Sequence, residues 1–315
     1  MNKVRSQLLL KSQPQPLGCQ RDWFWRGWKI RYTYIRPANF NPEKPALPVI
    51  CLHGFGSAIG HWRSNLIPLS QQHYIYALDF LGFGASEKAS ARYSVWLWAD
   101  LVYDFWRNFI NQSSVIVAHS LGALVALTAV AKHPEMACGL AMLTLPDVQE
   151  KQPPAWARAI ERALANPLLL LPIFKIIRQP WVLRKVLQKI YLRPELVDEE
   201  LVALFATPPQ DRGALEVFCL LSQYKSHDDY SPKVKDLLPE LQLPALLIWG
   251  QEDRVIPFTE ARRFLQLNPK LKLVEIERAG HCAFDEYPQL VNQEILDWIE
   301  NEVRNRLNQK AKVCR

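Results

Sequence analysis

The sequence predicts an α/β protein, built on a mostly parallel, doubly wound sheet with a helical insertion. Short apolar segments typical of buried strands alternate with segments of helical periodicity over residues 49–145, and again over residues 245–307. Such alternation produces a parallel sheet covered by helices on both faces. Strand signals vanish between the two halves. With 315 residues, 49% of them hydrophobic and 22% charged, the chain is long enough for one large domain with an insertion.

The first half opens with a predicted β-hairpin. Asp22 to Ile35 alternates aromatic or aliphatic residues with polar ones on either side of Arg26-Gly27, which is typical of two paired strands and their turn. Short apolar runs then predict buried strands, and longer segments with apolar residues at helical spacing predict the helices between them. The expected strands are residues 49–52, 74–78, 115–118 and 140–145, and the expected helices are residues 96–110 and 121–132.

The second half repeats this alternation after the insertion, with strands expected at residues 245–249 and 271–276 and helices at 259–267 and 289–307. We therefore predict a core of residues 22–148 and 241–308, a helical cap of residues 149–240, and tails at residues 1–21 and 309–315. The cap is expected to form short helices broken by prolines, which remove a backbone donor. These prolines are Pro167, Pro172, Pro180, Pro194 and Pro208-Pro209.

The strongest candidate for a catalytic residue is Ser120. It stands where the predicted strand 115–118 turns at once into the helix 121–132, with the small residues Ala118 and Gly122 two positions on either side. A serine at such a sharp turn is held in a strained conformation, with its hydroxyl exposed at a helix N-terminus where the dipole favours negative charge. A serine that only caps the helix is the structural alternative.

A serine nucleophile needs a neighbouring base and a carboxylate that orients this base. His281 follows the last predicted strand after a short turn, so we expect it at the sheet edge that carries Ser120. Asp253 lies just past strand 245–249 and is the favoured carboxylate. Asp147, after strand 140–145, is a rival, and Glu252 is a weaker one. The order Ser, Asp, His along the chain fits this arrangement.

The segment His53-Gly54-Phe55-Gly56 follows the first core strand. Its predicted contribution comes from the backbone: the N–H groups of Phe55 and Leu121 would together bind an oxyanion. We expect the His53 side chain to be structural. No metal-binding motif, paired CxxC or complete phosphate-binding loop is present, so neither a metal nor an organic cofactor is predicted.

These elements resemble the α/β-hydrolase superfamily over about residues 23–303. The matching segments are Leu52 to Gly56, Ala77 to Ser86, the Ser120 turn, Gly250 to Asp253, and Gly280-His281 with Glu286 and Pro288. The resemblance implies the α/β-hydrolase fold with a cap, and a serine hydrolase whose triad is Ser120, Asp253 and His281.

Within the superfamily, the sequence looks most like the cyanobacterial and plastid branch that includes pheophytinases and chlorophyll dephytylases. This likeness rests on residues 23–34 and 78–84 and on the cap around residues 190–218. It implies hydrolysis of a bulky lipophilic ester, such as the phytyl ester of a chlorophyll derivative. Alternatives are carbon–carbon bond or thioester hydrolysis by the same triad, and a non-catalytic accessory protein that binds a lipophile.

The net charge of +7 without an arginine-rich aromatic motif excludes a nucleic-acid partner and fits ordinary solubility. Scattered cysteines and the lack of a long apolar run predict a cytoplasmic protein, peripheral to a membrane at most. In the cap, residues 167–174 are apolar throughout, with four leucines in a row, and are followed by Lys175, Arg178, Arg184, Lys185 and Lys189. This segment is expected either to contact an anionic membrane or to admit a lipophilic substrate. The structural alternative is a cap helix that buries its leucines on the sheet and turns its lysines and arginines to water.

Overall fold

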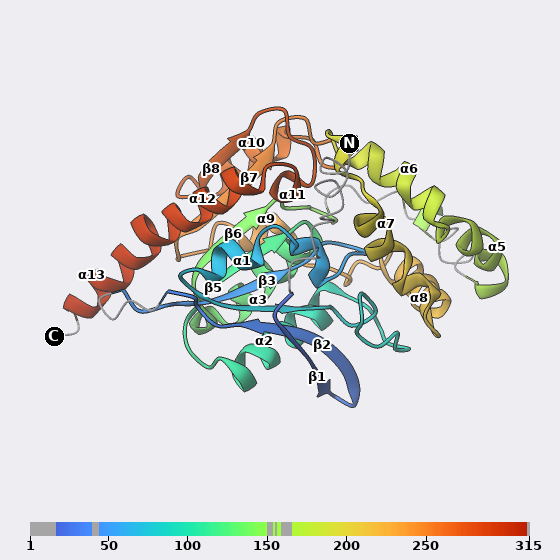
Figure 1. Ribbon diagram of the computed structural model, residues 1–315, viewed down its shortest axis with the longest axis horizontal. Helices are drawn as coiled ribbons and strands as arrows, with labels where there is room; N and C mark the ends of the chain where they lie inside the picture. The colour runs from blue at the N-terminus through green and yellow to red at the C-terminus, as the bar shows by residue number, and fades with distance from the viewer. Residues whose placement is uncertain (1–16, 40–43, 150–153, 155, 159–165, 314–315) are drawn as a thin grey trace, which may run out of the picture.

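An eight-stranded sheet forms the centre of the protein. In the computed structural model, which describes residues 17–39, 44–149, 154, 156–158 and 166–313, the strands are ordered β1-β2-β4-β3-β5-β6-β7-β8. β2 pairs antiparallel with β1 and β4, and all other neighbours are parallel. The predicted fold class is confirmed (Figure 1).

The strands agree with their predicted bounds to within three residues. The longest extensions are in β1 and β6, which each begin three residues before the predicted start, and the pairing of β6 with β5 continues through Gly139. The strands are β1 (Cys19–Trp25), β2 (Trp28–Ile35), β3 (Pro48–Leu52), β4 (Tyr74–Leu78), β5 (Ser114–His119), β6 (Ala137–Leu143), β7 (Ala245–Gly250) and β8 (Lys272–Ile276).

Both faces of the central strands are buried, which explains why these strands are apolar throughout. In β3, for example, Ile50 and Leu52 pack into one hydrophobic cluster, and Val49 and Cys51 into another on the opposite face. The first cluster includes helices α2 (Val95–Phe109), α3 (Leu121–Lys132), α9 (Val234–Leu237) and α10 (Thr259–Leu267). The second includes α1 (Leu66–Ser70), α11 (Ala283–Glu286) and α12 (Pro288–Trp298).

The C-terminal helix is longer than predicted. After α12 it continues through a π-helical turn, Ile299–Arg304, into α13 (Asn305–Val313), past the expected end of the core at residue 308. Residues 1–16 of the predicted N-terminal tail and residues 314–315 of the C-terminal tail lie outside the described residues.

Between β6 and β7 the described residues form helices and 3₁₀ turns but no strand. We call α5 (Pro167–Ile177), α6 (Pro180–Ile190), α7 (Glu199–Ala206) and α8 (Ala214–Tyr224) the helical segment. It occupies one end of the molecule, on the right in Figure 1. The helical segment falls within the predicted cap, and the division of the chain into core and cap stays a prediction.

The prolines of this region lie at helix boundaries as expected, with the exception of Pro172. Pro194 and Pro208 begin the 3₁₀ turns that separate α6 from α7 and α7 from α8. Pro167 and Pro180 are the first residues of α5 and α6, where the missing N–H has no helical acceptor in any case. Pro172 lies inside α5, which continues through it to Ile177. Proline therefore sets where these helices begin.

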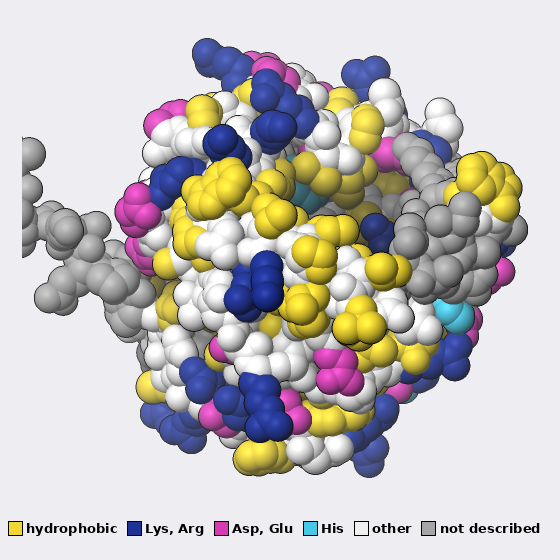
Figure 2. Space-filling model, turned by 90° about the vertical axis from the view of Figure 1, so that its right-hand side faces the viewer, with side chains coloured by type: hydrophobic (Ala, Val, Ile, Leu, Met, Phe, Trp, Pro, Cys, Tyr) yellow, Lys and Arg dark blue, Asp and Glu magenta, His cyan; other side chains and the backbone are white. Residues whose placement is uncertain are grey.

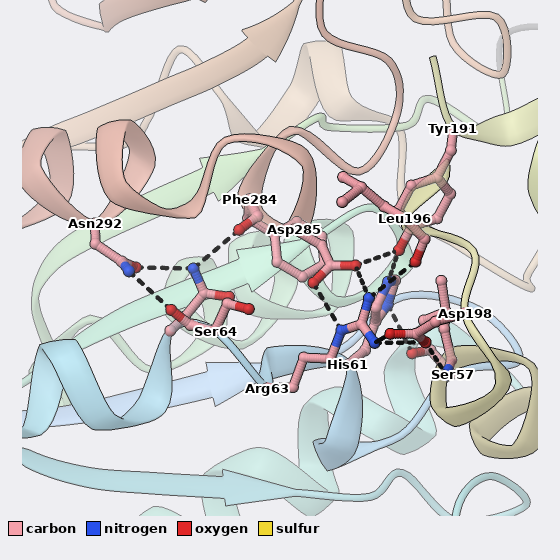
Figure 3. Close-up of polar contacts among 12 residues, drawn as sticks. Ser57, His61, Arg63, Ser64, Tyr191, Leu196, Asp198, Phe284, Asp285 and Asn292 are labelled. Atoms are coloured by element: carbon pink, nitrogen blue, oxygen red, sulfur yellow. Dashed lines mark hydrogen bonds and ion pairs between the residues drawn. The ribbon is translucent and has the colours of Figure 1, made fainter. Parts of the chain in front are cut away.

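A buried polar network joins the helical segment to the core (Figure 3). The hydroxyl of Tyr191, directly after α6, donates to Asp285 Oδ2 at 2.8 Å and accepts from Nε2 of His61 at 2.7 Å. Arg63 bridges two carboxylates, with Asp285 at 3.1 Å and Asp198, the N-cap of α7, at 2.9 Å. Asp285 and Tyr191 are almost fully buried, so each needs its partner.

Candidate active site

Ser120 occupies the turn between β5 and α3 and is half-buried. Its backbone has φ +51° and ψ −119°, in the region that non-glycine residues adopt only under strain. The close approach of neighbouring backbone enforces this turn. A Cβ atom at Gly122 would lie 2.6 Å from the carbonyl oxygens of Leu52 and His53, and one at Gly54 would lie 2.8 Å from Nδ1 of the buried His119, beside Ser120. Only glycine fits at either place.

His281 lies within hydrogen-bond reach of both predicted partners. Its Nε2 is 3.2 Å from Ser120 Oγ, and its Nδ1 is 2.8 Å from Asp253 Oδ2. The imidazole and the carboxylate are both buried. The structure thus brings Ser120, His281 and Asp253 together in one relay at the carboxyl ends of β5, β7 and β8.

The Asp253 carboxylate has hydrogen-bond partners besides His281. Its Oδ1 accepts the backbone N–H groups of Val255 and Ile256 at 2.7 and 2.8 Å. Its Oδ2 also accepts from Thr144 Oγ1 at 3.4 Å. Sequence reasoning missed Thr144, although it follows β6 at the same sheet edge. Three hydrogen bonds besides that of His281 hold this carboxylate in place as an acceptor.

The two rival carboxylates have other surroundings. Asp147 is buried and pairs with Arg263, whose Nη2 lies 3.0 Å from Oδ2. Glu252 is exposed to solvent. Neither of them hydrogen-bonds to His281, whose Nδ1 is taken by Asp253.

The backbone N–H groups of Phe55 and Leu121 are both free to bind a ligand. No hydrogen-bond acceptor for either group is present in the described part of the chain. Leu121 is the first residue of α3, so its N–H is one of the donors that a helix leaves unpaired. Gly54 brings the loop of Phe55 against Ser120. Two unpaired donors thus flank the serine.

Two further buried histidines, His53 and His119, hydrogen-bond to the backbone around the site. The His53 Nδ1–H donates to the Gly54 carbonyl at 2.7 Å, and its Nε2 accepts from the Phe80 N–H at 3.0 Å. His119 donates from Nε2 to the backbone carbonyl of His281 at 3.0 Å, and the two rings lie 4.8 Å apart. Burial lowers the pKa of His53 to about 4 and that of His119 well below its usual range. Both stay neutral at pH 7, as hydrogen-bonded structural groups.

An apolar pocket opens beside Phe55. It is lined mainly by aromatic and aliphatic side chains from the loops and from the helical segment, including Phe55, Phe83, Phe174, Val217, Phe218 and Leu221, and has a volume of about 120 Å³. Ser120 and His281 do not line it. Larger cavities, of about 430, 450 and 290 Å³, lie elsewhere among the described residues and include none of the three relay residues.

No cluster of three or more histidines, cysteines, aspartates or glutamates that could hold a metal ion occurs among the described residues. No described helix is long and apolar enough to cross a membrane.

Comparison with known proteins places this geometry in a family. Residues 49–294 match the Alpha/beta hydrolase family. The uncharacterized hydrolase YugF of Bacillus subtilis is 29% identical over 82% of this chain and 92% of its own length. Chloroplastic pheophytinase of Arabidopsis thaliana is 24% identical over 87% of this chain and 65% of its own length.

Among solved structures, a meta-cleavage product hydrolase from Pseudomonas fluorescens has the same fold, with a TM-score of 0.73 and 20% identity over 89% of this chain and 97% of that one. The family match spans most of the sheet and includes Ser120, Asp253 and His281. The chain therefore belongs to the alpha/beta hydrolase family.

Proposed function

We propose that this protein is a serine hydrolase that cleaves a carboxylic ester through an acyl-enzyme. Ser120 is the nucleophile, His281 the general base, and Asp253 the carboxylate that orients it. The observation that supports this proposal is the pair of hydrogen bonds made by His281, from Nε2 to Ser120 Oγ at 3.2 Å and from Nδ1 to Asp253 Oδ2 at 2.8 Å. A serine hydroxyl is a weak nucleophile until such a base accepts its proton.

The two half-reactions follow from this geometry. Ser120 Oγ attacks the carbonyl carbon while His281 Nε2 takes the hydroxyl proton, and the imidazolium is stabilised by Asp253. The tetrahedral intermediate then collapses, and His281 returns the proton to the leaving alcohol. Water attacks the acyl-enzyme with His281 again as base, which releases the acid and restores Ser120.

The oxyanion of the intermediate would bind the two unpaired backbone donors. The N–H groups of Phe55 and Leu121 have no acceptor among the described residues, so binding an oxyanion breaks no existing hydrogen bond. One such donor is typically worth about 3 kcal/mol of transition-state stabilisation.

We propose a bulky, lipophilic substrate such as the phytyl ester of a chlorophyll derivative. The apolar pocket beside Phe55 and the likeness to pheophytinase over 87% of the chain support this. A volume of about 120 Å³ is well below the roughly 300–1,000 Å³ typical of ligand sites. A long alkyl chain therefore requires α5 and α8, which carry Phe174 and Phe218 on the pocket wall, to move apart.

The proposal is tested first with a fluorophosphonate probe, which should label wild-type protein and leave Ser120→Ala unlabelled. Ser113→Ala, which alters an exposed serine before β5, should be labelled like wild type. A folded wild-type protein that resists labelling would contradict the serine hydrolase itself.

The substrate is tested by phytol release from pheophytin and chlorophyll in mild detergent. Wild type should release phytol, and Ser120→Ala should not. Cleavage of p-nitrophenyl esters without phytol release would keep the esterase and exclude the pigment ester. Turnover of dienones or acyl-CoA with no oxygen ester cleaved would instead assign carbon–carbon or thioester hydrolysis.

A further inference from the structure

Helices α5 and α6 expose an unusual number of large apolar side chains. The described residues contain thirteen large hydrophobic side chains that are exposed, and six of these lie on the two helices. Leu168 is the most exposed of all, at 82%. We call these six side chains the α5–α6 apolar patch: Leu168, Leu169, Ile173, Ile176, Trp181 and Val186.

The opposite sides of the same helices are packed against the protein. Phe174 of α5 is buried with its ring 5.3 Å from that of Phe218 on α8. Leu187 of α6 is buried in the hydrophobic cluster that also contains Leu201 of α7. Leu168 and Leu169 are exposed and Leu170 and Leu171 half-buried, and no leucine of α5 belongs to either hydrophobic cluster of the core. The structural alternative for this segment, leucines buried on the sheet, is therefore wrong.

Lysines stand among the apolar side chains of the patch. Lys175, Lys185 and Lys189 are exposed, and no carboxylate in the described ranges forms an ion pair with them. Neither α5 nor α6 contains an aspartate or glutamate. Lys185 Nζ lies 5.4 Å from the Trp181 ring centre, so the charge and the aromatic face point the same way. Arg184, by contrast, faces the protein and pairs with Glu199.

We infer that the α5–α6 apolar patch docks on the surface of an anionic lipid membrane. Helices that lie in a membrane interface insert an apolar face among the acyl chains, while lysines beside it reach the anionic headgroups. Tryptophan is favoured at this depth because its ring is both apolar and polar. The absence of any acidic residue on the two helices matches the negative charge of the lipids.

A second copy of the chain fits this patch poorly. A two-fold interface places the same patch on both subunits, so the three lysines of one copy would face those of the other without any carboxylate from α5 or α6 between them. An anionic surface removes that repulsion.

Figure 2 shows this end of the molecule. Hydrophobic side chains cover much of the face, Lys and Arg side chains lie among and around them, and the face is hollowed between its hydrophobic parts. The same α5 that carries the patch also lines the apolar pocket through Phe174. A membrane bound here would lie against the outer side of the pocket wall, where a lipophilic substrate could enter without crossing water.

The test is flotation with vesicles of phosphatidylcholine alone and of an equal mixture of phosphatidylcholine and phosphatidylglycerol. Wild type should bind the mixed vesicles, more weakly as salt rises, because screening acts on the lysines. Replacing Lys175, Lys185 and Lys189 by Gln should weaken binding about fivefold per lysine, or about a hundredfold together. The matched control changes the exposed Lys233, Lys235 and Lys270 to Gln and should keep the affinity.

The apolar contribution is tested with Leu168→Gln/Ile176→Gln, which should lose more than tenfold in affinity. Phe24→Gln/Leu290→Gln, which removes two exposed apolar side chains elsewhere, should bind like wild type. Unchanged circular dichroism and fluorophosphonate labelling would show that each variant is folded.

Three outcomes would overturn the inference: no binding to mixed vesicles by folded protein, equal binding to neutral vesicles, or unchanged binding by both patch variants. A patch variant that turns a dimer into a monomer in buffer would assign the patch to a second copy instead. Binding needs no hydrolysis, so Ser120→Ala should float like wild type. The two proposals therefore fail in different experiments. Absence of fluorophosphonate labelling would contradict the serine hydrolase, and absence of vesicle binding would contradict membrane docking.

Discussion

At the scale of single residues, the choice of hydrogen-bond partner separates Asp253 from Asp147. Both carboxylates follow parallel strands at the same sheet edge, and both are buried. Asp253 binds His281 and two backbone N–H groups, whereas Asp147 is neutralised by Arg263. The proposed roles of the two residues therefore differ although their positions in the sequence pattern are alike.

Asp253→Asn should lower kcat roughly 10,000-fold, because the amide can no longer hold His281 in the tautomer that accepts the serine proton. Asp147→Asn should change kcat only a few-fold, since it loses a pair with Arg263 outside the relay. Hydrolysis of a p-nitrophenyl ester measures both. Equal losses in the two variants would contradict the assignment of the carboxylate.

At the scale of elements, the attachment of the helical segment depends on a few polar contacts between residues distant in sequence. Tyr191 directly follows α6, and its hydrogen-bond partner Asp285 lies in α11, 94 positions later in the sequence. Tyr191, His61 and Asp285 are buried, so these three groups have no water to replace a lost partner, whereas Asp198 at the outer end of the network is exposed.

Tyr191→Phe removes the donor to Asp285 and the acceptor for His61 without changing the packing of the ring. We expect a loss of about 1–3 kcal/mol in the free energy of unfolding, since buried polar groups are left unpaired. Urea unfolding measures this loss. Tyr74→Phe, at a half-buried tyrosine whose hydroxyl has no hydrogen bond to a described residue, should shift stability by less than about 0.5 kcal/mol.

At the scale of the whole molecule, buried neutral histidines should govern the response to acid. Burial lowers the pKa of His53, His61 and His73 to about 4 in the folded state. The unfolded chain titrates near 6.5, so below that pH it binds protons that the folded chain does not. Each histidine therefore lowers stability as pH falls from about 6.5 to 4, by at most about 1.4 kcal/mol per pH unit.

Asp79 acts in the opposite direction. Burial raises the pKa of this carboxyl to about 6, so as pH falls the folded state takes up a proton before the unfolded state does and offsets part of the histidine effect. Burial also raises the pKa of Glu286, which acts in the same direction as Asp79, whereas burial lowers the pKa of His119, which adds to the effect of the other three histidines. We expect the urea midpoint to fall steadily from about pH 7 to about pH 5. His73→Gln, far from the relay, should make this fall shallower. A midpoint that rises or stays constant on acidification would contradict the prediction.

Much of the fold and the candidate residues of the relay could be predicted from the sequence, because these features depend on local order. Apolar runs of strand length alternating with helical periodicity give the parallel sheet, and the strand ends place Ser120, Asp253 and His281 at one edge. The glycines at 54 and 122 are required by the close approach that a sharp strand-to-helix turn imposes.

Contacts between distant residues could not be predicted in this way. The pairing of Asp147 with Arg263, the support of Asp253 by Thr144 and the link from Tyr191 to Asp285 each join different elements. Of the prolines expected to break helices, only Pro172 lies inside one, and the sequence pattern does not distinguish it from the prolines at helix boundaries.

The sequence by itself determined the fold class and the set of polar residues at the sheet edge, since hydrophobic periodicity and chain order are properties of short segments. Only the tertiary structure decided which carboxylate meets the histidine and which side of α5 faces solvent. Leu168 and Phe174 look equally apolar in the sequence, yet one is exposed and the other buried. Burial depends on which residues the folded chain packs against each side of a helix. The local sequence pattern holds no information about these distant residues.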